Sequence, residues 1–181
     1  MTRVIVVASG KGGVGKTTIA ANLAVALSLF GKKVAVVDAD IVMANLEIIM
    51  GLKNPPVALI DVLKGRLEVE DVIYEGPEGV KIIPAGITLD GFNEENMETL
   101  KTLLKEIPAY IEILVIDAPA GRDATMVMDR GQEVIIVTVP QVSSVSDALK
   151  MKILAERMGA EVTGAVINMA RGRKYELTAE E

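Results

Sequence analysis

The sequence contains neither cysteine nor histidine in its 181 residues. Without cysteine the chain forms no disulfide and offers no thiolate to a metal ion or an iron–sulfur cluster. Without histidine it also lacks the commonest other metal ligand and the side chain most often used as a general base near neutral pH. Any metal ion that these residues hold must therefore be bound through oxygen atoms.

Aromatic residues and net positive charge are also missing or scarce. Phe, Tyr and Trp make up 3% of the chain, and the formal net charge is −6. Domains that bind nucleic acid usually carry a basic face, and those that bind single strands use aromatic side chains for base stacking. We therefore expect no nucleic acid partner.

Long apolar runs are absent as well. No stretch approaches the roughly eighteen uncharged apolar residues of a membrane span, and residues 1–3 lead directly into an apolar run instead of a signal peptide. Apolar residues make up 50% of the chain, which suits one domain with a sizeable core. We expect a cytoplasmic protein with a single domain over residues 1–181.

The most informative stretch is residues 9–18, which read S-G-K-G-G-V-G-K-T-T. It fits the phosphate-loop pattern G-x-x-x-x-G-K-[ST]. It also lies between an apolar run at residues 4–8 and a segment with apolar residues at helical spacing, which is the context that the pattern requires. A glycine-rich structural turn is the alternative, and this context makes it the weaker one.

The residue types of this loop match the chemistry of phosphate binding. Its four glycines allow backbone conformations closed to other residues, so that successive N–H groups converge on phosphate oxygens at the positive end of the next helix. Lys16 is expected to reach the terminal phosphates, and the Thr17 hydroxyl is expected to ligate Mg²⁺. Lys11 is not needed to close the loop, so by itself it is either a solvated charge or an extra phosphate contact. The nucleotide-binding residues expected from the motif are Gly12, Gly13, Val14, Gly15, Lys16, Thr17 and Thr18.

Acidic residues follow two of the apolar segments. Residues 34–37 are followed by Asp38 and Asp40, and residues 111–116 are followed by Asp117. Open α/β sheets bind their ligands at the carboxyl ends of the strands. Behind a phosphate loop, an apolar strand that ends in Asp is typical of a Walker B position, so Asp117 is expected to hold the hydration shell of Mg²⁺. For Asp38 and Asp40 the alternative interpretation is a turn.

Strand and helix patterns alternate along the chain. This order predicts a doubly wound α/β fold, a three-layer sandwich with a largely parallel sheet of about six strands and helices on both faces. Gly31 is expected to end the first helix, and Ser144 or Ser146 is a candidate to cap the last one. The predicted strands are residues 4–8, 34–37, 80–84, 111–117, 133–140 and 164–168, and the predicted helices are the one after the phosphate loop, residues 58–67, residues 94–105 and a segment that ends at residue 158.

The loop G-K-G-G-V-G-K-T-T resembles the deviant Walker A motif of the MinD/ParA class of ATPases, in which the early lysine, here Lys11, is the signature residue. Further segments resemble motifs of the MinD family in the same order, although Ala44 and Gln141 depart from residues that are common there. These segments are D-x-D-x-x-x-x-N-L at residues 38–46, A-P-A-G at residues 118–121, P-Q-V-S-S-V-S-D-A at residues 140–148 and a strand that ends at Asn168.

The resemblance implies a switch that dimerises when ATP is bound, hydrolyses ATP to ADP and phosphate, and acts in spatial positioning such as division-site placement. It assigns catalysis to Lys11, Lys16 and Asp40, with Lys11 crossing the dimer interface to the nucleotide of the other subunit and Asp40 orienting the attacking water. It assigns Mg²⁺ to Thr17, Asp38 and Asp117, and recognition of the adenine base to Asn168, for which a turn-forming role is the alternative.

The implied partners are ATP and ADP, a second copy of the chain, and a regulatory protein. Family members continue beyond the equivalent of residue 181 and end in an amphipathic helix, through which they lie on the inner face of the cytoplasmic membrane when ATP is bound. We therefore interpret this chain as lacking the family's C-terminal elements, and we expect membrane contact only through that helix. A ParA-like partitioning ATPase, and a carrier or synthetase of the same class, are the alternatives.

Overall fold

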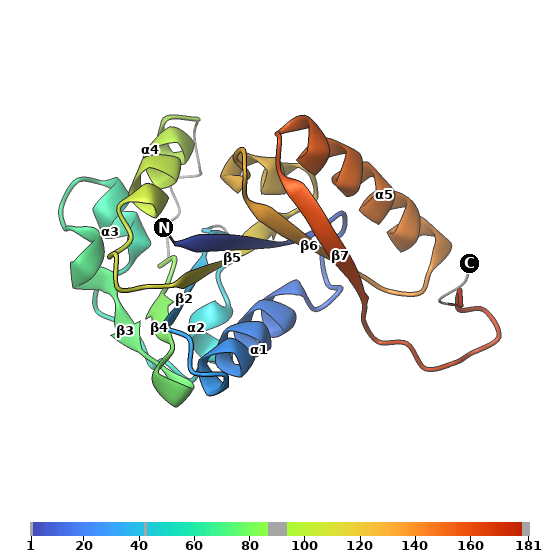
Figure 1. The fold of residues 1–181 in the computed structure, drawn as a ribbon, viewed down its shortest axis with the longest axis horizontal. Coiled ribbons are helices and arrows are strands. Elements are labelled where there is room, and N and C mark those ends of the chain that lie inside the picture. The colour runs from blue at the N-terminus through green and yellow to red at the C-terminus, as the bar shows by residue number, and fades with distance from the viewer. Residues whose placement is uncertain (1, 42, 87–93, 179–181) are drawn as a thin grey trace.

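The computed structural model describes residues 2–41, 43–86 and 94–178. Its centre is a seven-stranded sheet in the order β3-β4-β2-β5-β1-β6-β7 (Figure 1). β3 is antiparallel to β4, and every other pair of neighbours in this sheet is parallel. The strands are β1 (Arg3–Ser9), β2 (Val34–Asp38), β3 (Tyr74–Glu75), β4 (Lys81–Ile83), β5 (Ile113–Ala120), β6 (Glu133–Thr138) and β7 (Glu161–Ile167).

Helices cover both faces of the sheet (Figure 1). α1 and α2 pack on one face, and α3, α4 and α5 pack on the other. None of the helices in the described part of the chain has the length and apolar character needed to cross a bilayer. The α-helices are α1 (Lys16–Leu29), α2 (Leu46–Ile49), α3 (Leu59–Leu63), α4 (Glu94–Lys105) and α5 (Val142–Arg157), and the 3₁₀ helices are η1 (Val69–Val72), η2 (Pro77–Gly79) and η3 (Gly121–Val127).

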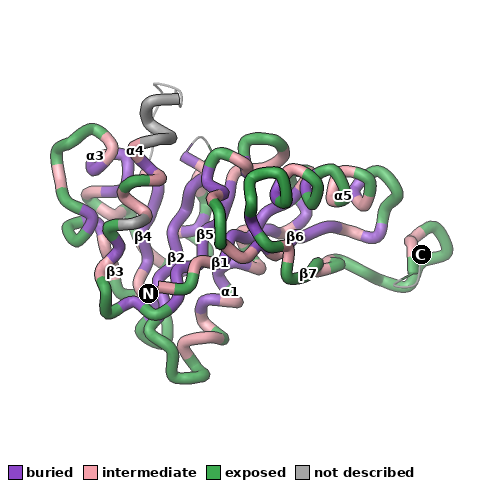
Figure 2. Tube along the Cα trace, turned by 45° about the horizontal axis from the view of Figure 1, so that its top comes forward, coloured by how far each residue is buried: buried purple, intermediate pink, exposed green. Residues whose placement is uncertain are grey.

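The two apolar cores follow from the alternation of side chains along the central strands. Ile5 and Val7 of β1 lie in the core beneath α1, whereas Val6 and Ala8 lie in the core beneath α3, α4 and α5. Because both faces are covered, the central strands are continuous apolar runs. Figure 2 shows this burial along β1, β2 and β5, and it shows that β7, at one edge of the sheet, is largely exposed.

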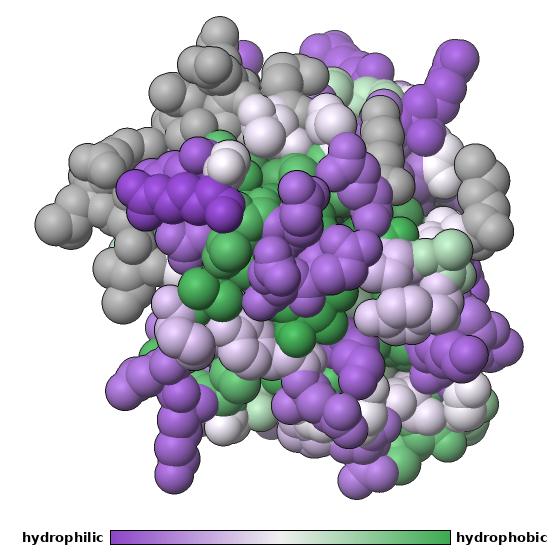
Figure 3. Space-filling view, turned by 90° about the vertical axis from the view of Figure 1, so that its left-hand side faces the viewer, coloured by the Kyte–Doolittle hydropathy of each residue, from purple (hydrophilic) through white to green (hydrophobic). Residues whose placement is uncertain are grey.

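The other edge of the sheet ends in the short strand β3. Figure 3 views the molecule from this side, where hydrophilic side chains cover much of the surface and apolar atoms show between them. Lys81 of β4 and Glu75 of β3 form an ion pair of 3.2 Å. Charged side chains on a short edge strand disfavour pairing with the edge of another chain.

The predicted fold class is confirmed, and each of the six predicted strands is present. The sequence pattern missed β3, which has two residues, and α2, which has four. Gly31 follows the end of α1 with a φ of 80°, as expected for a glycine in that place. The predicted serine caps of α5 are wrong, because Gln141 occupies the cap position and makes no side-chain cap bond. Instead, the Ser144 hydroxyl is buried and accepts a hydrogen bond from the Val139 N–H at 3.3 Å.

Candidate functional site

The phosphate loop joins β1 to α1 at the carboxyl edge of the sheet. Gly13 and Gly15 have left-handed backbone angles, with φ of 76° and 91°, which glycine adopts without strain. Gly15 directly precedes Lys16, the first residue of α1, and its carbonyl accepts the Ile19 N–H at 3.0 Å. The loop therefore ends at the N-terminus of a helix, where unpaired N–H groups and the helix dipole favour anions.

Gly10 is a glycine for a different reason. A Cβ atom at this position would lie 2.3 Å from the carbonyl oxygen of Asp147 in α5. This is far inside van der Waals contact, so any side chain would force the loop away from the helix. The expectation that all four glycines supply conformational freedom is confirmed for Gly13 and Gly15 and is wrong for Gly10 and Gly12, which have no positive φ; Gly10 permits close packing instead.

One cavity of about 580 Å³ unites most of the predicted phosphate-binding residues. The predicted residues that line it are Gly12, Gly13, Gly15, Lys16, Thr17, Thr18 and Asp40. The Asp40 carboxylate accepts the Met43 N–H at 3.1 Å, which holds Asp40 at the cavity wall. Several other lining residues were not predicted from the sequence, although most of them lie within nine residues of Asp40 or in the phosphate loop itself. These residues are Ser9, Met43, Asn45, Ile48, Ile49, Ala120 and Met169.

Lys16, which lines this cavity, forms a buried ion pair with Asp117. The Lys16 Nζ donates to Asp117 Oδ1 at 2.7 Å, and the two side chains are 9% and 1% exposed. Burial raises the pKa of Asp117 above its ordinary value, and the positive charge of Lys16 opposes that shift. The second carboxylate oxygen of Asp117, Oδ2, is buried without a hydrogen-bond partner. A buried acceptor in this state is suited to a cation or to a water molecule bound to one.

Asp38 uses both of its carboxylate oxygens to hold the segment that follows β2. Its Oδ1 accepts the Asp40 N–H at 3.0 Å, and its Oδ2 accepts the N–H groups of Asn45 and Leu46, each at 3.1 Å. Burial, and then the charge of Asp117, raise the pKa of Asp38 to about 7, while the three backbone donors act in the opposite direction. Asp38 therefore positions Asp40 and the start of α2. The Mg²⁺ role assigned to Asp38 stays a prediction.

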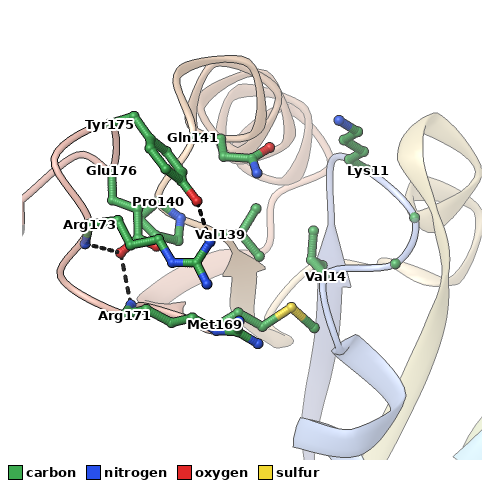
Figure 4. A pocket seen from close by; sticks show the side chains of 12 residues that line it. Lys11, Val14, Val139, Pro140, Gln141, Met169, Arg171, Arg173, Tyr175 and Glu176 are labelled. Atoms are coloured by element: carbon green, nitrogen blue, oxygen red, sulfur yellow. Dashed lines mark hydrogen bonds between the residues drawn. The ribbon is translucent and has the colours of Figure 1, made fainter.

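A second cavity, of about 320 Å³, lies beside the first (Figure 4). The two cavities share Gly12, Gly13 and Met169 as lining residues. Lys11 and Val14 line the second cavity on the loop side, and the segment after β7 forms the opposite wall. That segment is folded around Glu176, whose carboxylate accepts the backbone N–H groups of Arg171 and Arg173 at 2.8 and 3.3 Å.

Asn168 follows β7 and contacts the phosphate loop. Its Nδ2 donates to the Val14 carbonyl at 2.8 Å, and its backbone N–H donates to the Thr138 carbonyl at 2.8 Å. Asn168 thus lies next to the second cavity, at the level of the loop. Lys11, in contrast, is exposed, and the structure gives it no ion pair within the described part of the chain.

A family model described as ParA, the NUBPL iron-transfer P-loop NTPases, matches residues 1–178. The chain belongs to the ParA/MinD family of P-loop NTPases. It is 51% identical over 179 residues to an uncharacterised ATP-binding protein of Methanocaldococcus jannaschii, a match that covers 98% of this chain and 68% of that protein.

Solved structures of MinD have the same fold. The cell division ATPase MinD of Pyrococcus furiosus aligns with a TM-score of 0.89 and 36% identity, over 99% of this chain and 77% of the other. MinD of Pyrococcus horikoshii, solved as a complex with Mg-ADP, aligns with a TM-score of 0.87 and 34% identity, over 99% of this chain and 75% of the other. The chain thus spans about three quarters of these MinD chains.

The ParA/MinD family consists generally of ATPases, and membership agrees with the geometry of the site. The phosphate loop, Asp40 and Asp117 come from three separate parts of the sequence and meet at one edge of the sheet. They meet there because β1, β2 and β5 are adjacent and parallel, so that their carboxyl ends lie together.

Proposed function

We propose that the chain is a nucleotide-dependent switch that binds MgATP, dimerises in that state, and hydrolyses ATP to ADP and phosphate. The observation that carries this proposal is the 580 Å³ cavity in which Lys16, Thr17 and Asp40 converge at the N-terminus of α1. Such a cavity provides backbone donors, a cation and a carboxylate around the place of a triphosphate.

The donor set fits Mg²⁺ bound together with phosphate. No group of three or more acidic side chains able to hold a metal ion occurs among the residues that the structure describes. Mg²⁺ characteristically uses one or two protein ligands and completes its shell with water and phosphate oxygens. The Thr17 hydroxyl and the unpartnered Asp117 Oδ2 would hold Mg²⁺, and Asp38 is the third residue assigned to it. Bound there, Mg²⁺ would neutralise charge on the phosphate oxygens.

The remaining roles belong to three side chains of the loop and the Asp40 segment. Lys16 would exchange its contact with Asp117 for the terminal phosphates, because it already lies in the cavity. Asp40 would orient the attacking water from the cavity wall. Lys11 would act on the nucleotide of a second copy, a role supported by its exposure and by the resemblance of the loop to the deviant Walker A motif.

We further propose that residues 1–181 form one ATPase domain, and that the protein acts in spatial positioning, such as division-site placement, together with a regulatory protein. The identity to MinD supports this role over a ParA-like partitioning role, and the net charge of −6 disfavours DNA as the main partner. Iron transfer, named in the description of the family model, would need ligands other than cysteine in this sequence.

The test compares Lys16→Ala with Lys11→Ala. Lys16→Ala is expected to abolish ATP binding, whereas Lys11→Ala is expected to bind ATP nearly as the parent does and to lose ATP-dependent dimerisation. Titration calorimetry measures binding, and light scattering after size-exclusion chromatography measures the mass with and without MgATP.

A matched control is Lys32→Ala. Lys32 is an exposed lysine beyond the far end of α1, 3.8 Å from Glu112, and its loss should change neither quantity. Equal losses of ATP affinity in the Lys11 and Lys16 variants would contradict the role of Lys11 in a second subunit.

A further inference from the structure

The side chain of Asn168 ties the last strand of the sheet to the middle of the phosphate loop. Its Nδ2 donates to the Val14 carbonyl at 2.8 Å, across 154 positions of sequence. The opposite orientation of the amide would place its oxygen against a carbonyl oxygen, so only the donor can face Val14. Asn168 is itself held in place, because its backbone N–H donates to the Thr138 carbonyl at the end of β6.

Glycine at the next position allows this close contact. A Cβ atom on Gly15 would lie 2.3 Å from the Asn168 Nδ2. Gly15 also has a φ of 91°, which side chains rarely adopt, and a Cβ atom there would displace the Asn168 amide from Val14. The sheet and the loop are therefore fitted to each other at Val14 and Gly15.

The hydrogen bond also sets the direction of a neighbouring donor. The Val14 carbonyl and the Gly15 N–H belong to one peptide group, and the described chain has no cis peptide bond. In a planar trans peptide the C=O and N–H point in opposite directions. A carbonyl held toward Asn168 therefore turns the Gly15 N–H away from Asn168, and Gly15 lines the 580 Å³ cavity.

We propose that Asn168 is a positioning residue for phosphate binding, which orients the Gly15 N–H by holding the Val14 carbonyl. This inference rests on the proposed nucleotide binding. It is separate from recognition of the base, because the amide keeps its oxygen and its second N–H for another partner. Asn168 would therefore contribute to the binding of any ligand with a triphosphate, with or without a base.

The test measures the affinity of Asn168→Ala for MgATP and for magnesium tripolyphosphate, which has no base. In this variant the ligand itself must order the loop, at a cost no larger than the free energy of the lost hydrogen bond, so we expect both ligands to bind more weakly by up to about five- to tenfold. If MgATP weakens while tripolyphosphate binds as to the parent, Asn168 acts on the base alone and the proposal is overturned. Unchanged binding of both ligands overturns it as well.

Asn22→Ala is the matched control. The Asn22 Nδ2 also donates to a backbone carbonyl at 2.8 Å, that of Thr18, but from the exposed side of α1. Its loss should change neither affinity by more than about twofold, since an exposed hydrogen bond exchanges readily with water. Asn168→Ser, whose hydroxyl is too short to reach Val14, takes the place of the alanine variant if that variant does not fold.

Hydrogen exchange of the nucleotide-free chain separates this inference from the proposed function. Amides of residues 9–18 should exchange faster in Asn168→Ala than in the parent or in Asn22→Ala, because the loop loses its tether. If the parent binds neither ligand, the proposed function fails while a faster exchange still supports the tether. Equal exchange in all three proteins would overturn the proposal that Asn168 positions the phosphate loop.

Discussion

Removal of Lys16 should destabilise the nucleotide-free protein far more than removal of its partner Asp117. In Lys16→Met, a carboxylate that is 1% exposed keeps its charge and loses its cation, and its Oδ2 already lacks a partner. Breaking a buried pair in this way costs about 3–5 kcal/mol. In Asp117→Asn the lysine remains, but it lines a cavity and can reach water, so the expected cost is about 1–2 kcal/mol.

The destabilisation caused by Lys16→Met should depend on pH. The folded pKa of Asp117 is already raised by burial, and loss of Lys16 raises it further. A raised carboxyl pKa contributes stability below the pKa of the unfolded chain, and this contribution is lost as pH rises through the folded pKa. The deficit of Lys16→Met relative to the parent should therefore shrink as pH falls from neutral into the acid range, because protonation of Asp117 removes the uncompensated charge.

Thermal unfolding without nucleotide or Mg²⁺, repeated over a series of pH values from neutral into the acid range, measures this effect. For a chain of this size a loss of 3–5 kcal/mol lowers Tm by roughly 6–20 °C. Arg3→Met is the control, because it breaks an exposed ion pair. The side chains of Arg3 and Glu133 are 57% and 24% exposed, and such pairs contribute about 0–1 kcal/mol to the free energy of unfolding. Equal losses in Lys16→Met and Asp117→Asn, or a deficit that does not change with pH, would show that Lys16 does not neutralise a buried Asp117 charge.

Two further predictions concern the segment after β2. Asp40→Ala should bind MgATP like the parent and hydrolyse it very slowly, because orientation of water matters in the transition state and little in the ground state. Single-turnover kinetics measure the hydrolysis rate. A rate within a few-fold of the parent would make Asp40 a structural residue. Asp38→Ala removes the acceptor of three backbone N–H groups, so the amides of Asp40, Asn45 and Leu46 should exchange at least about tenfold faster, and unchanged exchange would show that other contacts hold this segment.

The phosphate loop and the order of strands could be predicted because their signals are local. A strand, a glycine-rich turn and a helix in succession specify where an anion binds. Parallel strands bring Asp38 and Asp117 to one edge of the sheet, independently of the segments between them. The bounds predicted for α4 agree with the structure for the same reason. β3 and α2 were missed because two and four residues are too few to show a period.

The protein contacts of the same site residues could not be predicted. Asp38 accepts N–H groups from a segment whose path depends on the whole loop, and Asn168 meets Val14 across 154 positions. Sequence motifs identify side chains by the ligand that they are expected to hold, and they do not show what those side chains contact within the chain itself.

These contacts bear directly on how tightly a nucleotide can bind. Lys16 donates to Asp117 at 2.7 Å, so where a contact with phosphate replaces that bond, only the difference between the two interactions contributes to affinity. Cation binding at Asp117 would satisfy the carboxylate that Lys16 leaves, which makes the two steps mutually favourable. Phosphate and Mg²⁺ should therefore bind with positive coupling at this site, because each removes the cost that the other would have to overcome alone.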